Sequence, residues 1–200
     1  MTLHDISVAL GPGTPEWPDD TPYSCGWTWL IARGASVNVS AITMSPHVGT
    51  HADAPYHVDD RWAASEALPL EAFFGPAIVC DIDQVDALGD TRVERLLLRT
   101  GRSIAGGAFP ASWPALDTRL VESLLARGLR LLGVDAPSVD RRESTTLDVH
   151  RTLFAAGACN LENLDLRRVP NGEYTLLAFP LRVTGLDAAP VRAVLTSVES

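Results

Sequence analysis

The most informative stretch of the chain is residues 45–60, SPHVGTHADAPYHVDD, which contains three of the five histidines. Its candidate metal-binding side chains are His47, His51, Asp53 and His57. In a fully extended chain, at ~3.3 Å per residue, the Cα atoms of His47 and His51 would lie ~13 Å apart, too far for both imidazoles to bind one ion comfortably. A shared ion therefore requires a turn between them, and Gly49 can supply it because glycine adopts backbone angles closed to other residues.

The residue types in this stretch indicate a transition-metal site. Pro46 and Pro55 restrict the backbone on both sides of the candidate ligands, which favours a preorganised site. Imidazole and carboxylate together suit zinc, with manganese or iron as alternatives, whereas calcium and magnesium prefer oxygen ligands alone. Burying so many polar groups without a metal or paired hydrogen bonds is costly, so a purely structural role is the weaker interpretation.

The bulk composition limits the classes of partner and chemistry. A length of 200 residues favours one domain, residues 1–200, and a net charge of −9 without a basic cluster argues against nucleic acid and anionic membranes as partners. All sixteen basic residues are arginines, which excludes lysine-based catalysis. No signal-peptide pattern or apolar span of ~18 residues is present, so we expect a soluble cytoplasmic protein. We also expect reduced cysteines, with Cys80 and Cys159 buried.

Hydrophobic periodicity predicts an α/β domain. Strands are expected at 3–9, 36–44, 76–82, 129–135, 159–164 and 173–184. Helices are expected from Asp117, a plausible N-cap, to Gly128, at 144–157, and in a shorter piece at 90–98. The spacing within 144–157 turns His150 inward. Residues 10–35, rich in proline and tryptophan, are expected to form a long loop that must pack against another surface.

The motif at residues 47–57 resembles the H-x-G-T-H-x-D-x-P-x-H signature of the metal-dependent cyclase-like hydrolases. Within that family, the chain resembles the bacterial kynurenine formamidases (arylformamidases) over nearly its whole length. The supporting stretches are EWPDDTPY (16–23), GVDAPSVD (133–140), LDVHRTLFAAGACNLENL (147–164) and LDAAPVRAVL (186–195). The resemblance implies a single-domain swivelling β/β/α fold with a mixed, barrel-like sheet, and it suggests a homodimer whose 10–35 loop could reach the site of the neighbouring subunit.

The resemblance also implies the site. It assigns His47, His51 and Asp53 to one zinc, with Asp53 bridging to a second zinc held by His150 and Glu162. The residues themselves are consistent with this, because Glu162 interrupts an apolar run and a buried glutamate needs a partner.

Two further residues are expected to act on the substrate. His57 is the candidate acid and base, since histidine is the residue type best suited to take and give protons near neutral pH. A role for His57 as a further ligand or as support for the ligands stays open. Trp17 resembles the substrate-contacting tryptophan of the family, and its alternative role is a plain loop anchor.

The implied reaction is hydrolysis of N-formyl-L-kynurenine to L-kynurenine and formate, a step of tryptophan degradation by the kynurenine pathway. One alternative is another cyclase-family amide or lactam hydrolase, such as an isatin hydrolase. Another is a relative that binds metal without catalysis. A serine hydrolase is excluded, because the chain contains no G-x-S-x-G motif.

Overall fold

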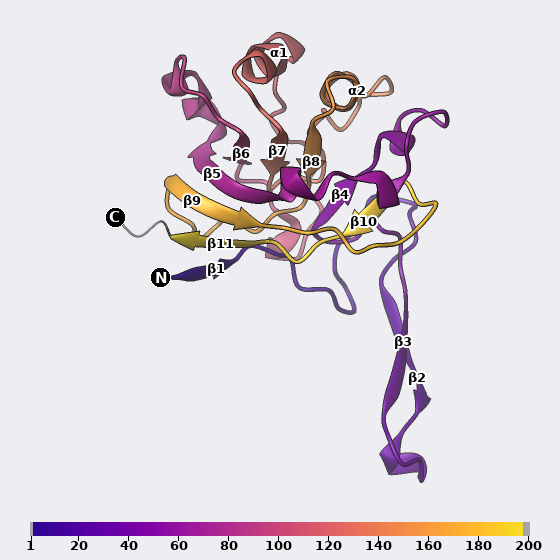
Figure 1. Ribbon diagram of the computed structural model, residues 1–200. Helices are drawn as coiled ribbons and strands as arrows, with labels where there is room; N and C mark the ends of the chain where they lie inside the picture. The colour runs from indigo at the N-terminus through magenta and orange to yellow at the C-terminus, as the bar shows by residue number, and fades with distance from the viewer. Residues whose placement is uncertain (1, 198–200) are drawn as a thin grey trace.

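A strongly curved mixed sheet forms the centre of the protein in the computed structural model, which describes residues 2–197 (Figure 1). In spatial order its seven strands are β1 (Leu3–Asp5), β11 (Val194–Ser197), β9 (Gly172–Leu177), β5 (Phe74–Asp81), β6 (Arg95–Arg99), β7 (Leu131–Val134) and β8 (Cys159–Leu161). Neighbours from β1 to β5 pair antiparallel, and those from β5 to β8 pair parallel. The sheet is therefore mixed, as predicted.

The two edges of this sheet meet and give it a barrel-like form. Ser7, just after β1, forms an antiparallel bridge with Leu164, just after β8. A separate pair, β4 (His51–Asp53) and β10 (Ala188–Pro190), joins the same edge because His51 bridges to Glu162 at the end of β8. The expected α/β architecture with a barrel-like sheet is confirmed, and the closure brings β4 against β8.

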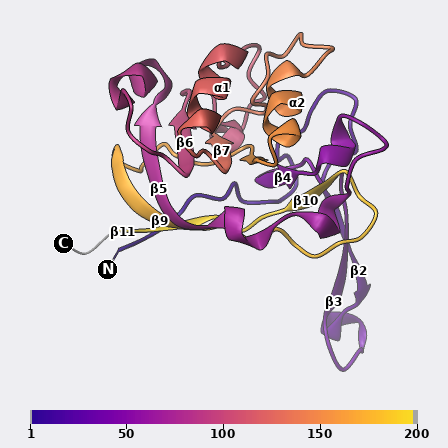
Figure 2. The ribbon, with the colours of Figure 1, turned by 45° about the horizontal axis from the view of Figure 1, so that its top comes forward.

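Helices cover one face of the parallel half of the sheet (Figures 1 and 2). The two helices on this face are α1 (Thr118–Ala126) and α2 (Asp148–Ala155). The described residues also form short 3-10 helices elsewhere in the chain: η1 (Ile31–Arg33), η2 (Pro55–His57), η3 (Ser65–Ala67), η4 (Leu70–Phe73), η5 (Ile82–Leu88) and η6 (Ile104–Gly106). Asp117 caps α1 as predicted, accepting a hydrogen bond from the Arg119 N–H at 2.8 Å. Helix α2 begins later than the predicted residue 144, because Leu147 adopts a left-handed conformation with φ of 51°.

The predicted helix at 90–98 is wrong. Residues 95–99 form strand β6, in which Leu96, Leu97 and Leu98 are all fully buried. A strand buried on both faces has a continuous apolar run rather than an alternating one, so its pattern does not distinguish it from a helix. The strand predictions at 3–9, 76–82, 129–135, 159–164 and 173–184 each contain a strand, whereas β4, β10 and β11 were not predicted.

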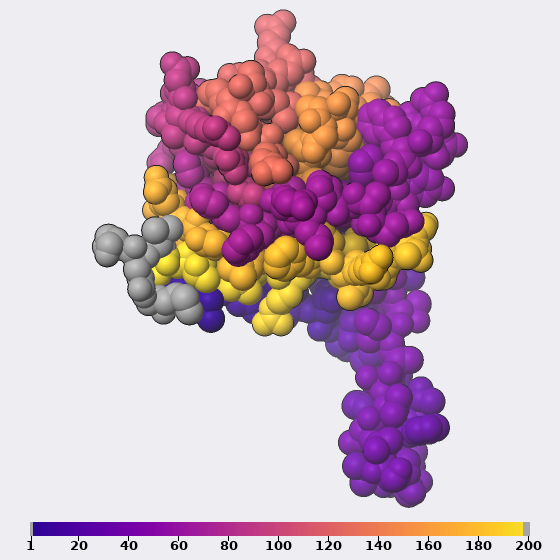
Figure 3. Space-filling view, in the orientation of Figure 1, coloured from indigo at the N-terminus to yellow at the C-terminus, as the bar shows by residue number. Residues whose placement is uncertain are grey.

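The predicted loop at residues 10–35 is wrong for residues 24–29, which form a strand. Strand β2 (Ser24–Trp29) pairs with β3 (Val39–Thr43), which lies in the predicted strand at 36–44, and the hairpin projects away from the body (Figures 1 and 3). Every residue of both strands is exposed, including Trp27 at 56% and Trp29 at 58%. We call residues 24–43 the arm. Its base is closed by a hydrogen bond from the Ser45 N–H to the Thr21 carbonyl.

Two other expectations concern burial and membranes. Cys80 and Cys159 are buried, as predicted, and burial raises the pKa of the Cys80 thiol to about 11. Within residues 2–197, none of the helices has the length and apolar character needed to cross a bilayer.

Candidate metal centre

The turn before β4 has the geometry that the sequence predicted. Gly49 has a φ of 73°, and a Cβ atom there would lie 2.5 Å from Cδ2 of Leu10, so both backbone conformation and space favour glycine. After the turn, His51 and Asp53 point to the same side of β4 and are 1% and 0% exposed. Gly49 thus allows the chain to bring His47 back toward these two residues.

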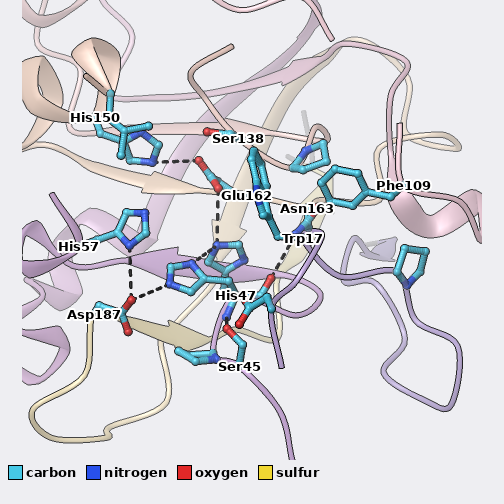
Figure 4. A pocket seen from close by; sticks show the side chains of 16 residues that line it. Trp17, Ser45, His47, His57, Phe109, Ser138, His150, Glu162, Asn163 and Asp187 are labelled. Atoms are coloured by element: carbon cyan, nitrogen blue, oxygen red, sulfur yellow. Dashed lines mark hydrogen bonds and ion pairs between the residues drawn. The ribbon is translucent and has the colours of Figure 1, made fainter. Parts of the chain in front are cut away.

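The downstream candidates reach this cluster from two other elements. The His51 N–H donates to the Glu162 carbonyl at 3.3 Å and the Glu162 N–H donates to the His51 carbonyl at 3.0 Å, so backbone pairing brings Glu162 to β4. From α2, His150 Nε2 lies 3.1 Å from Asp53 Oδ2 and 3.1 Å from Glu162 Oε1. His47 Nδ1 lies 3.0 Å from Asp53 Oδ1. The structure therefore brings all five predicted ligand residues together. Figure 4 labels three of them, His47, His150 and Glu162.

Each ligand imidazole has one nitrogen bound to an acceptor outside the cluster. Nδ1 of His51 donates to the Gly49 carbonyl at 2.9 Å, and Nδ1 of His150 lies 2.6 Å from Asp140 Oδ2. His47 uses Nε2, which lies 2.9 Å from Asp187 Oδ2. Metal-binding histidines characteristically donate their second N–H in this way, which leaves the other nitrogen as a lone-pair donor. In all three, that other nitrogen faces the carboxylates of Asp53 or Glu162.

The environment of Asp53 Oδ1 shows that these residues fit a bound cation. This buried oxygen has no hydrogen-bond partner among residues 2–197, although His47 Nδ1 and His51 Nε2 lie 3.0 and 3.2 Å away. A buried acceptor without a partner is costly, and lone pairs facing a carboxylate oxygen repel it. A divalent cation would satisfy all three atoms, and the mixed nitrogen and oxygen donors suit zinc.

The electrostatics of the metal-free cluster support the same conclusion. Burial would lower the pKa of His51, but the Asp53 and Glu162 carboxylates raise it to about 10. Burial opposes the pKa rise at His47 as well, where Asp187 and Asp53 raise it to about 9. The histidines hold the pKa of Asp53 well below its ordinary value, despite complete burial. Without a cation, the cluster therefore holds protons between its imidazoles and carboxylates.

His57 lies within the cluster rather than apart from it. Ligand atoms of His47, Asp53 and His57 all lie within 4.8 Å of one another, as do those of His51, Asp53 and Glu162. His57 ends helix η2, and its Nδ1 lies 3.4 Å from Asp187 Oδ2. This position is compatible with a role as acid and base and with a role as a further ligand.

A cavity of about 410 Å³ opens onto the cluster. His47, His51, His57, His150 and Glu162 line it, together with Trp17, Phe109 and Asp187 (Figure 4). The Trp17 ring meets Phe109 and Trp113 edge-on, with centroid distances of 5.4 and 5.8 Å. The cavity thus places an aromatic surface near the candidate metal ligands, and Trp17 belongs to that surface.

Several residues support the ligands, and two of them, Asp140 and Asp187, were not predicted individually. Asp140 accepts from the backbone N–H groups of Val149 and His150 and from the His150 ring, so one carboxylate both caps α2 and orients a ligand. Asn160 donates to Asp53 Oδ2 at 2.6 Å. Asp140 and Asp187 lie in the stretches at 133–140 and 186–195 that carry the family resemblance. That resemblance was the one feature of the sequence that could have indicated their role.

Comparison with known proteins identifies the family. A sequence family described as "Putative cyclase" matches residues 4–141, which is more than half of the chain. The chain belongs to the Cyclase family. The matched residues include His47, His51 and Asp53. The other two candidate ligands, His150 and Glu162, lie after the matched residues of this Cyclase-family protein.

Solved structures share the whole Cyclase-family fold. A potential metal-dependent hydrolase with cyclase activity is 29% identical, with 97% of this chain and 96% of that chain covered and a TM-score of 0.82. A predicted metal-dependent hydrolase from Bacillus stearothermophilus is 26% identical, with 97% of each chain covered and a TM-score of 0.79. Isatin hydrolase A from Ralstonia solanacearum is similar in fold, at 22% identity, 97% and 91% coverage and a TM-score of 0.78. The expected cyclase-like fold is therefore confirmed.

Proposed function

We propose that this protein is a metal-dependent amidohydrolase, an arylformamidase that hydrolyses N-formyl-L-kynurenine to L-kynurenine and formate in tryptophan degradation. One observation carries the proposal: a single cavity has the candidate metal ligands on one side and the aromatic side chains of Trp17 and Phe109 on another. A formanilide has an amide to be hydrolysed and an aryl ring to be held, and these two surfaces suit the two parts.

The proposal assigns two zinc ions to the cluster. His47, His51 and Asp53 would hold one, and Asp53 would bridge to a second held by His150 and Glu162. Bound zinc would polarise the formyl oxygen and activate water near neutral pH. The protein residues hold these positions without the metal, because Asp140, Asp187 and the Gly49 carbonyl fix the imidazole orientations.

His57 has the role of proton donor in this proposal. Water adds to the formyl carbon and gives a proton to His57. The C–N bond then breaks, and His57 passes that proton to the leaving arylamine nitrogen, because an arylamide anion is a poor leaving group. His57 lines the cavity and sits among the ligands without being needed for either proposed ligand set. Trp17 would hold the aryl ring by stacking.

An isatin hydrolase activity is the second candidate. The isatin hydrolase A structure shares the fold, and none of the described cavity-lining residues is an arginine that could pair with the carboxylate of an amino-acid substrate. Isatin carries no carboxylate before its ring opens, so this lining suits it. Against this, the carboxylate of Asp20 at the cavity could bind the ammonium group of formylkynurenine.

Parallel assays on the zinc-loaded protein would decide between these functions. N-formyl-L-kynurenine, a simple formanilide and isatin are each followed, by arylamine release or by ring opening. We expect the largest kcat/KM for N-formyl-L-kynurenine. A larger value for isatin would establish the second candidate, and no turnover of any of the three would make the protein a metal-binding relative without catalysis.

We further propose that two copies associate through the arm. An isolated two-stranded hairpin is marginally stable in water, yet the arm exposes Trp27, Trp29 and Ile42. A second exposed apolar patch lies on the body, where Phe74 and Phe179 stack at 6.2 Å and each is about half exposed. The arm of one copy has the apolar character to cover this patch on another.

Sedimentation equilibrium tests the association. We expect a dimer for the unaltered protein and a monomer for the double variant Trp27→Ser, Trp29→Ser. The matched control is Leu3→Ser, another exposed apolar residue, which should leave the dimer intact. A monomer for the unaltered protein, or a dimer for the double variant, would contradict this assignment.

A further inference from the structure

We infer that Asp187 is the positioning residue of the proposed reaction, because one of its carboxylate oxygens orients both the ligand imidazole of His47 and the proton-donating imidazole of His57. This inference rests on the proposed function for the role of His57. The positions of the protons on the His47 and His57 rings do not depend on the proposed function, and they would be the same for any reaction at this site.

The geometry places a single oxygen between two rings. Asp187 Oδ2 lies 2.9 Å from His47 Nε2 and 3.4 Å from His57 Nδ1 (Figure 4). The two ring centroids are 4.6 Å apart. A carboxylate oxygen only accepts hydrogen bonds when ionised, so both nitrogens that face it must be the N–H forms. An aspartate side chain is ordinarily ionised at neutral pH, which meets this condition.

These proton positions decide what the other nitrogens can do. With its proton on Nε2, His47 presents Nδ1 as a lone-pair donor toward Asp53 Oδ1, at 3.0 Å. With its proton on Nδ1, His57 leaves Nε2 available for exchanging a proton with a substrate or water in the cavity that it lines. Asp187 therefore assigns one imidazole to metal binding and its neighbour to proton transfer.

The backbone holds Asp187 in register with the ligand strand. Its carbonyl accepts from the Ala54 N–H at 2.8 Å, and the next residue, Ala188, pairs with Asp53. The carbonyl of Leu186 accepts from the Ser65 N–H at 2.9 Å. The Asp187 side chain itself is 39% exposed, so it is not held there by core packing. The Asp187 carboxylate points toward the two imidazoles because it accepts hydrogen bonds from them, and not because core packing forces it there.

Nuclear magnetic resonance of the zinc-loaded protein tests the positions of the ring protons without any substrate. Two-bond ¹H–¹⁵N correlations report which ring nitrogen of a neutral histidine is protonated, and spectra are recorded above the ordinary titration range of imidazole. We expect the Nε2–H form for His47 and the Nδ1–H form for His57. The Nε2–H form at His57, or metal bound through Nε2 of His47, overturns the inference whatever the substrate proves to be.

Variants test the consequence for catalysis. Asp187→Asn is nearly isosteric but loses the charge that strengthens both hydrogen bonds. For such a supporting residue we expect a kcat about 10 to 100-fold lower, a KM changed less than about threefold, and zinc bound in the same stoichiometry but more weakly. Asp187→Ala should lower kcat further.

The matched control is Glu66→Gln. Glu66 accepts a hydrogen bond from the Gly185 N–H at 2.9 Å and so supports the loop that precedes Asp187. Among residues 2–197, Glu66 forms no hydrogen bond with an imidazole. It should keep kcat within about twofold and leave the histidine spectra unchanged. Equal losses in the Asp187 and Glu66 variants would reduce Asp187 to a loop anchor, and loss of a full zinc equivalent in Asp187→Asn would make it a ligand. Either result overturns the inference.

Discussion

Removal of metal should make the stability of the protein depend strongly on alkaline pH. The folded-state pKa of His51 without metal is about 10, against 6.5 for an ordinary histidine. A raised folded-state pKa contributes stability that is complete below the unfolded value and is lost as pH rises through the folded value. Metal-free protein should therefore lose stability between about pH 7 and about pH 9.

The expected size of this loss follows from the same shift. Each pH unit in this window removes about 1.4 kcal/mol per histidine, so His51 alone accounts for about 3 kcal/mol over two units. In a domain of this size, ~1 kcal/mol shifts Tm by ~2–4 °C, which gives a fall of ~6–12 °C. The raised pKa of His47, to about 9, acts in the same direction.

Zinc-loaded protein should behave differently. Metal replaces the protons between imidazoles and carboxylates, so Tm should vary little with pH in this window, and zinc at ~100 times its Kd should add ~2.7 kcal/mol. Calorimetric unfolding of chelator-treated and zinc-loaded samples at several pH values measures how Tm depends on pH in each form. His51→Ala should flatten the metal-free slope, whereas substitution of His4, which lies on β1 beside Tyr174, should not. If Tm fell equally with pH in the presence and absence of zinc, protonated histidines could not be the cause of the loss of stability.

The other predictions concern individual side chains. His51→Ala should lose both metal and activity, whereas His57→Ala should keep metal and lose ~10²–10⁴-fold in kcat, and equal metal loss in the two would contradict the role assigned to His57. Trp17→Ala should raise KM by ~2–10-fold with little change in kcat, as steady-state kinetics would show, and an unchanged KM would argue against stacking. Gly49→Ala should lower the free energy of unfolding by ~1–3 kcal/mol, since its Cβ would lie 2.5 Å from Leu10 and its φ is 73°; denaturant titration measures the change.

The ligand set was predictable because much of its chemistry is local in sequence. The spacing of His47, His51 and Asp53 and the glycine between them required a turn, and the turn is present. His150 could be placed inward from helical periodicity alone. The link between these residues and Glu162, however, came from family resemblance, because it depends on a bridge between β4 and β8 that local pattern does not encode.

The errors have equally specific causes. Strand β6 was predicted as a helix because three consecutive buried leucines have no strand-like alternation. The first half of the arm was predicted as part of a loop because residues 10–35 lack clear periodicity, and sequence pattern cannot tell that Trp27 and Trp29 remain exposed. Asp187 was missed because its contact with His47 joins residues 140 positions apart.

The paired backbone hydrogen bonds between His51 and Glu162 have a consequence for how the protein acquires its cation. Main-chain pairing joins the two strands that carry the candidate ligands, so their approach does not depend on an ion. We therefore expect that a metal bound here could be removed and replaced without unfolding, in contrast to a zinc finger. The ion found at this site would then reflect which divalent species the surroundings supply, ranked by the general affinity order of first-row metals, more than any selection made during folding.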